Sequence, residues 1–274
     1  MKIKDSGINS IRIVAYNIFR GGEDEDKSRM PLIEQVIKDI APTVIATQEV
    51  VNFDKEDYAK LKQFISKVGL PNWEHSKGIL RPSGRSFDVA TFSTIPLKKI
   101  SDFNQTMRNG ALNVVIDTVF GEISICNVHL TPGTEDERMI EIKKAIESQS
   151  PVHNKIILGD LNSLARVDNY SPDFISKFNE SQKKKFLTEG KTRYDVTDTL
   201  LKLGYIDLAA ELNCKENTVP TASNVDVAHE CPLRLDYIFI SKPLLKHVLG
   251  FGVVKTDYSE KASDHYPLVL SLGE

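Results

Sequence analysis

Apolar residues along this chain occur in short runs of strand length. Many runs are apolar at successive positions, which is typical of strands buried on both faces of a sheet. Two runs meet at Gly121, which predicts a hairpin and therefore sheets that are mixed rather than all parallel. The predicted strands are residues 11–18, 43–50, 87–93, 112–120, 123–130, 155–160, 235–241, 248–254 and 267–272.

Helical periodicity fills several of the intervals between these runs. Three amphipathic helices are predicted, at residues 30–41, 57–69 and 137–147. Pro31 suits the first turn of the first helix, because proline lacks the amide hydrogen that is unpaired there anyway. Gly69 suits the end of the second helix as a left-handed cap.

Strands and helices alternate along the whole chain, and no linker or repeat marks a boundary. We therefore expect one layered α/β domain, at residues 8–273. Within it, residues 163–230 form the irregular part, with Ser171 as the predicted cap of a helix. We interpret this region as an inserted lid or wall beside a site. A solvated helix with an apolar stripe is the alternative.

Polar residues fall repeatedly at the ends of the predicted strands, where ligand sites of α/β sheets gather. Taken singly, each has an ordinary explanation. Asp160 after Gly159 suits a turn, His129 suits a hydrogen-bonded core position, and Asp236 could pair with Arg234. The whole set is harder to explain in this way: Asn17, Gln48, Glu49, His129, Asp160, Asn162, Asp236, Asp264 and His265.

The carboxylates in this set predict a bound cation. Half-buried carboxylates at Glu49, Asp160, Asp236 and Asp264 would repel one another and lose solvation unless positive charge compensates. Carboxylate and amide oxygens suit Mg²⁺, or alternatively Mn²⁺, better than Zn²⁺. His129 and His265 are then left for phosphate contact or proton transfer.

Composition limits the partners and the cellular location that we expect for this protein. A formal net charge of -3 gives no overall attraction to nucleic acid or to an anionic membrane. The first residues contain no apolar run that would indicate a signal peptide, and no membrane anchor is visible. Cys126, Cys214 and Cys231 are widely spaced, which favours core thiols over a disulfide framework. We expect a cytoplasmic monomer.

Six short motifs in one order resemble the endonuclease/exonuclease/phosphatase (DNase I-like) superfamily. They are YNI, TQEV, NVHL, GDLN, RLDYIF and SDH, and the resemblance runs from about residue 11 to residue 272. The resemblance implies a four-layer α/β sandwich, with two mixed β-sheets packed face to face and helices on the outside. It also implies Mg²⁺-dependent hydrolysis of a phosphoester.

Metal and phosphate binding are assigned by the same resemblance. Glu49 is similar to the principal metal ligand of the family, and Asp264 to the second carboxylate of the metal site. Asn17 lies beside them as a further metal-binding and substrate-binding residue, where it would orient the metal, the phosphate or the nucleophile. Asn162 and His265 are similar to the residues that bind phosphate.

Proton transfer is assigned by the resemblance as well. Asp160 corresponds to the residue that positions or deprotonates the attacking water. Asp236 is expected behind His265, where it would fix the tautomer of the imidazole. His129 is expected to protonate the leaving group, with Asp88 either as its carboxylate partner or as an ordinary carboxylate at a strand edge.

The substrate stays open at this stage. We expect a phosphodiesterase acting on DNA, RNA or a small phosphodiester. The alternatives are a phosphomonoesterase and a non-catalytic nucleic-acid-binding module. Acidic residues 23–26 would repel a phosphate backbone, whereas Lys183, Lys184 and Lys185 are possible phosphate contacts.

Overall fold

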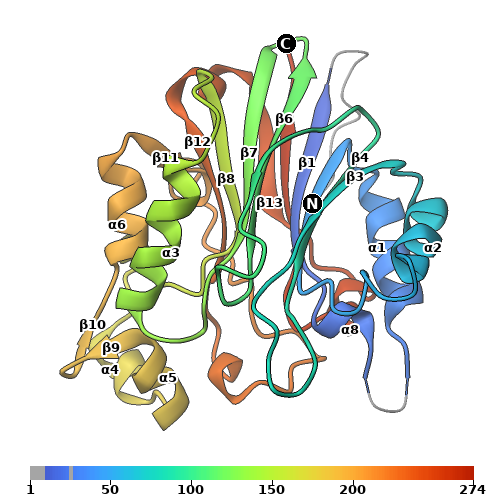
Figure 1. The fold of residues 1–274 in the computed structure, drawn as a ribbon. Coiled ribbons are helices and arrows are strands. Elements are labelled where there is room, and N and C mark those ends of the chain that lie inside the picture. Colours follow the sequence, from blue (N-terminus) through green and yellow to red (C-terminus); the bar gives the residue numbers. More distant parts are fainter. Residues whose placement is uncertain (1–9, 25–26) are drawn as a thin grey trace.

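The computed structural model describes residues 10–24 and 27–274, so Glu25 and Asp26 of the acidic stretch and the first two residues of the predicted domain lie outside it. Two six-stranded mixed sheets form its centre (Figure 1). One sheet has the order β13 (Val248–Val253), β14 (Leu268–Leu272), β1 (Ile11–Asn17), β2 (Val44–Gln48), β4 (Val89–Ser93), β3 (Asn72–Ser76). The other has the order β11 (Tyr205–Asp207), β12 (Asp236–Ser241), β8 (Asn154–Asp160), β7 (Gly121–His129), β6 (Ala111–Thr118), β5 (Lys98–Asp102).

Helices cover the outer face of each sheet, which confirms the four-layer sandwich (Figure 1). On the first sheet lie α1 (Met30–Ile40), α2 (Ala59–Val68) and the short α8 (Ser259–Ala262). On the second lie α3 (Glu135–Glu147) and α6 (Asp195–Lys202). The predicted roles of Pro31 in the first turn of α1 and of Gly69 as the left-handed cap of α2 are both confirmed.

All of the strands predicted from apolar runs are present, and Gly121 begins the second strand of the β6–β7 hairpin. Within the described residues, three strands of the six-stranded sheets were missed: β3, β5 and β11. Strand β5 pairs only with β6 at the edge of its sheet, and its residues are exposed or half-buried. Strand β3 has the sequence NWEHS and is an edge strand too. Because an edge strand needs no apolar run, periodicity cannot detect it.

Residues 163–230 are more regular than predicted. They contain α4 (Pro172–Ser176), α5 (Glu180–Phe186), β9 (Leu187–Thr188), β10 (Lys191–Thr192), α6, β11 and α7 (Leu208–Glu211). The expectation of an irregular insertion is therefore wrong for its second half, where β11 extends a sheet and α6 covers it. In the first half, Ser171 caps α4 as predicted, and Phe178 and Phe186 belong to a small separate core.

A buried amide network crosses the apolar space between the sheets. Gln48 Nε2 donates to Asn127 Oδ1 (2.7 Å), and Asn127 Nδ2 donates to the carbonyl oxygens of Thr47 (3.2 Å) and Ala90 (3.0 Å). The network joins β2 and β4 of one sheet to β7 of the other. Both amides lie just before residues of the predicted site, Glu49 and His129.

Gly159 lies in β8 where no other residue fits. Its φ is 123°, and a Cβ atom there would lie 2.1 Å from the Val128 carbonyl oxygen. We expect Gly159→Ala to destabilise the protein by about 3 kcal/mol or more, because backbone strain and a main-chain clash add up. Urea unfolding would measure this change. Gly204→Ala is the control, since its φ of 84° carries similar strain without any contact. Equal losses in the two variants would contradict the steric argument.

Two further expectations concern membrane-spanning helices and the cysteine thiols. No helix in the described part of the chain is long and apolar enough to cross a membrane. All three cysteines are free thiols, but only Cys126 is a core residue. Cys214 and Cys231 are half-buried, so the expectation of three core thiols is wrong for these two.

Candidate active site

Strand register brings three of the predicted site residues side by side. In the parallel pairing of β7 with β8, His129 lies opposite Asp160. In the antiparallel pairing of β8 with β12, Asp160 lies opposite Asp236. These three buried residues therefore share one edge of the second sheet.

The first sheet contributes the other predicted residues at the same edge of the sandwich. Asn17 ends β1, Glu49 directly follows β2, and Asp264 and His265 precede β14. Ser263 Oγ donates to the Asn17 carbonyl oxygen (2.6 Å), which ties the segment before β14 to the end of β1.

Asp160 both holds a turn and faces the site. Its Oδ1 accepts a hydrogen bond from the Asn162 amide (2.8 Å), the geometry of a local aspartate turn. Its Oδ2 lies 3.4 Å from His129 Nε2 and 3.8 Å from His265 Nε2. Burial raises the pKa of Asp160 to about 6, although the charge of His265 acts in the opposite direction. The turn thus fixes one oxygen and leaves the other for chemistry.

Asn17 links the two sheets at the site. Its Nδ2 donates to Asp160 Oδ2 (3.2 Å) and more weakly to Glu49 Oε1 (3.5 Å). Its Oδ1 accepts from the Phe19 amide (3.0 Å). Asn17 is thus arranged to orient two carboxylates, and the second lone pair of its oxygen stays available to a ligand.

Glu49 is a strained and electrostatically unfavourable carboxylate. Its φ is 62°, in the left-handed region, and Oε2 accepts from the Arg20 amide (2.8 Å). Burial and the neighbouring charge of Asp264 raise the pKa of Glu49 to about 7. A carboxylate that has lost its solvation beside another negative charge is stabilised by a cation.

His265 is held by Asp236, as predicted. His265 Nδ1 donates to Asp236 Oδ2 (2.7 Å), while Arg234 pairs instead with Asp168 and Asp207. Burial alone would lower the pKa of His265, but Asp236 and Asp264 outweigh it and raise the pKa to about 10. His265 is therefore an imidazolium at neutral pH.

His129 lies in the site but does not have the predicted partner. Asp88 Oδ2 instead lies 2.9 Å from His75 Nε2, and Asp88 Oδ1 accepts from the Gly78 amide (3.0 Å), so the pairing of Asp88 with His129 is wrong. Among the described residues, His129 Nδ1 has no hydrogen-bond partner. Burial and the charge of His265 lower the pKa of His129 well below its ordinary value, which leaves the imidazole neutral.

Two residues near the site were not among the site residues predicted from the sequence. The His229 ring packs edge-on against His265, with 5.0 Å between centroids, and its Nδ1 lies 3.6 Å from Asp264 Oδ2. Lys185 Nζ lies 3.3 Å from His229 Nε2. The lysine run at 183–185 indicated possible phosphate contacts, but sequence alone could not show that only the third lysine is buried.

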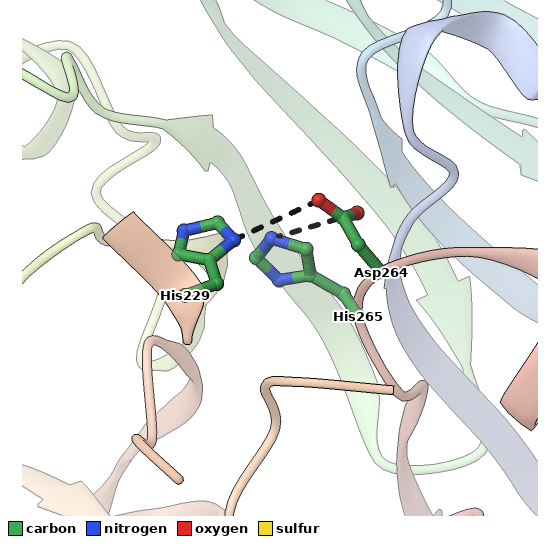
Figure 2. Close-up of side chains that lie close together, drawn as sticks. All are labelled: His229, Asp264 and His265. Atoms are coloured by element: carbon green, nitrogen blue, oxygen red, sulfur yellow. Dashed lines mark ion pairs between the residues drawn. The ribbon is translucent and has the colours of Figure 1, made fainter. Parts of the chain in front are cut away.

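Two groups of side chains are close enough to hold a metal ion. His229, Asp264 and His265 form one group, and Figure 2 shows the two ring nitrogens directed at the Asp264 carboxylate. Asp160, Asp236 and His265 form the other. Glu49 belongs to neither group, although the charge of Asp264 acts on it.

The nitrogen ligands in these groups are already engaged by other contacts. An ammonium has only hydrogen atoms to donate, so Lys185 makes His229 Nε2 the acceptor and leaves the ring proton on Nδ1, facing Asp264. His265 donates from Nδ1 to Asp236 and is protonated at neutral pH. The free donor set is therefore mainly carboxylate oxygen.

A cleft of about 320 Å³ is lined by six residues of the site: Glu49, His129, Asp160, Asn162, Lys185 and His229. Asp236, Asp264 and His265 are buried and are not part of its lining. Arg81 stacks on Phe87 (3.7 Å from the guanidinium carbon to the ring centre) and donates to Asn109 Oδ1 (2.7 Å). The insertion contributes Lys185 and residues 225–227 and 229 to the lining. Five residues of the segment 163–230 therefore line the cleft.

The acidic stretch after β1 is partly neutralised. Glu23 pairs with Lys60 (3.0 Å), and Asp24 pairs with Arg29 (2.9 Å). The charges of these two carboxylates therefore act mainly within the loop, and repulsion of a phosphate by them is smaller than the sequence indicated.

Comparison with known proteins assigns the chain to a family. The sequence model of the Endonuclease/Exonuclease/phosphatase family matches residues 14–265. The comparison with curated proteins gave no significant match.

Solved structures of several proteins share the fold. A family protein from Leptotrichia buccalis C-1013-b is 19% identical, with a TM-score of 0.66 over 96% of this chain and 100% of that one. An AP endonuclease from Archaeoglobus fulgidus is 17% identical, with a TM-score of 0.65 over 96% and 99%. A 3′ phosphatase from Neisseria, solved with a product DNA hairpin, is 16% identical, with a TM-score of 0.64 over 96% and 100%.

Proposed function

Because the chain belongs to the endonuclease/exonuclease/phosphatase family, we propose that it is a Mg²⁺-dependent phosphoesterase that hydrolyses a phosphodiester. The observation that carries this proposal is the convergence of five buried groups: Glu49 and Asp160 line one cleft, His265 lies 3.8 Å from Asp160 and is held by Asp236, and the charge of Asp264 acts on Glu49. A nucleic acid is a candidate substrate, since structural neighbours include an AP endonuclease and a 3′ phosphatase bound to DNA. A cytoplasmic location and a monomeric state stay predictions from the sequence.

The residues present fit a hard divalent cation. Glu49 and Asp264 are buried carboxylates, and the charge of Asp264 contributes to the raised pKa of Glu49. Oxygen donors of this kind suit Mg²⁺, and also Mn²⁺. Glu49 and Asp264 would hold such an ion, which would supply positive charge that offsets the charge of the phosphate.

The side chains of the chain itself have distinct tasks in this proposal. Asp160 Oδ2 accepts a proton from the attacking water, since its other oxygen is fixed by the Asn162 amide. The His265 imidazolium donates to a non-bridging oxygen, where negative charge develops. Asn162 and Asn17 position the phosphate and the carboxylates. The lowered pKa of His129 favours the neutral imidazole, so His129 acts as a hydrogen-bond donor to the leaving oxygen rather than as the predicted general acid.

Turnover of bis-p-nitrophenyl phosphate tests this function. We expect hydrolysis with Mg²⁺ or Mn²⁺ and none after EDTA treatment, with activity restored when the ion is returned. DNA and RNA oligonucleotides assayed in the same way would identify the nucleic acid, if one is the substrate. A folded protein that binds Mg²⁺ but cleaves none of these would be a binding module instead.

Metal binding should be linked to the release of a proton. The pKa of Glu49 is about 7 without an ion, so at lower pH the ion must displace a proton. We expect Mg²⁺ to raise the melting temperature more at about pH 8 than at about pH 6. Calorimetry on the wild type and on Glu49→Gln would measure this. The variant should show a smaller rise that no longer depends on pH in this range, and an unchanged pH dependence would remove Glu49 from the metal site.

A further inference from the structure

Lys185 is a buried ammonium group that lacks a carboxylate partner. Its side chain is 4% exposed, and no carboxylate oxygen of the described chain lies within 4.0 Å of Nζ. Among the described residues, the polar partner of Lys185 Nζ is His229 Nε2 at 3.3 Å, and Nζ also lies 5.2 Å from the centre of the Phe186 ring. Since an ammonium has three hydrogens to donate, two are left for a ligand in the cleft that Lys185 lines. Burying a cation without a counter-ion costs free energy, so an anionic ligand beside Lys185 would stabilise it.

The main chain holds Lys185 firmly in this place. Arg138 is fully buried, and its guanidinium donates to the carbonyl oxygens of Lys185 (2.6 Å) and Gly133 (2.7 Å). Gln182 and Asn179 form a capping box at the start of α5. The Arg138 contacts fix the end of α5 against the loop that follows His129, and the capping box fixes the start of the helix. The ammonium is therefore preorganised beside the site rather than free to swing into solvent.

The charge of a phosphodiester does not need this extra cation. A diester carries one negative charge on two non-bridging oxygens, which His265 and the metal site already serve in the proposed function. A phosphomonoester has a third terminal oxygen and a charge of about −1.5 to −2 at neutral pH. The third oxygen needs its own donor, and Lys185 is a donor with unused hydrogens close enough to Asp160 for their charges to interact.

We propose that Lys185 is a specificity-determining residue that binds the third terminal oxygen of a phosphomonoester, so that the site removes terminal phosphate groups as well as cleaving diesters. The proposal rests on the proposed phosphoesterase function. In the reaction, water oxygen bonds to phosphorus as the ester P–O bond breaks. One proton of the water ends on the leaving alcohol, and the other stays on the inorganic phosphate. His229 orients Lys185 through the 3.3 Å contact.

Two substrates with the same leaving group test this proposal: p-nitrophenyl phosphate and bis-p-nitrophenyl phosphate, each assayed with Mg²⁺. We expect the wild type to hydrolyse both. In Lys185→Met, kcat/KM should fall about 10- to 100-fold on the monoester, the size of a lost hydrogen bond to a charged group, and much less on the diester. Lys184→Met is the matched control, because Lys184 is the exposed neighbour on the same helix and should change neither rate.

The variant is expected to fold, since methionine removes a buried charge at similar volume, and its melting temperature should equal or exceed that of the wild type. A second measurement needs only the wild type. Inorganic phosphate should inhibit more strongly than dimethyl phosphate, by about 10-fold or more.

Equal losses on both substrates, a wild type inactive on the monoester, or equal inhibition by the two anions would each overturn the role of Lys185 while leaving diester hydrolysis in place. A wild type inactive on both substrates would overturn the proposed function itself.

Discussion

Replacing Asp160 with asparagine should lower metal-dependent phosphoester hydrolysis by about 100- to 10,000-fold, the range lost with a general base. Asparagine keeps the shape of the side chain, and its oxygen can still accept from the Asn162 amide. It cannot take a proton from water. The loss should appear in kcat, because the proton moves only in the transition state.

Stability separates this effect from misfolding. Asp160 is buried and its pKa is raised to about 6, so removing its charge should leave the melting temperature unchanged or raise it. Asp39→Asn is the control, since Asp39 is exposed on α1 and contacts only Gln35. A folded Asp160→Asn protein with nearly wild-type turnover would show that another group activates the water.

The second large effect is expected at His265. His265→Gln should lower kcat/KM by about 100- to 1,000-fold, the loss seen when one donor to a developing oxyanion is removed. Glutamine can donate a neutral hydrogen bond but lacks the charge that Asp236 and Asp264 stabilise on the imidazole. The variant should therefore be impaired at every pH, which a pH–rate profile would show.

Asp236→Asn gives a graded version of the same test. The wild-type pKa of His265 is raised to about 10, with Asp236 as its largest favourable influence, so the imidazolium persists across the physiological range and is lost as pH rises through that value. Without the Asp236 charge this loss should occur at lower pH. We expect the alkaline limb of activity to move toward neutrality in the variant. An unmoved limb would mean that the charge of His265 is not required.

Apolar periodicity predicted the central strands of both sheets well, because strands such as β1 and β8 are buried on both faces and need continuous apolar sequence. It could not predict β3 or β5, which lie at sheet edges. These strands form because they pair with a neighbouring strand rather than because their side chains are buried. The order in which strands pair was likewise invisible, since it depends on contacts between residues far apart in sequence.

The site was predictable to the extent that its residues end strands. Asp160, Asp236 and His129 become neighbours through register alone. His129 and Asp160 stand out in the sequence because they follow apolar runs, and Asp236 stands out because it lies within one. Lys185 and His229 carry no such mark, because their places depend on how α5 and the segment before β12 fold back on the cleft. The pairing of Asp88 with His75 rather than His129 also depends on tertiary packing.

The amide network between Gln48 and Asn127 also maintains the spacing between site residues that belong to different sheets. Glu49 is carried by one sheet and His129 by the other, so a small sliding of the sheets would alter the spacing on which the reaction depends. Apolar side chains allow such sliding at little cost, because dispersion contacts have no preferred direction. Hydrogen bonds between amides are directional. The hydrogen bonds of Gln48 and Asn127 therefore fix the position of one sheet relative to the other. The apolar residues around them can change while the distance between the two halves of the site is preserved.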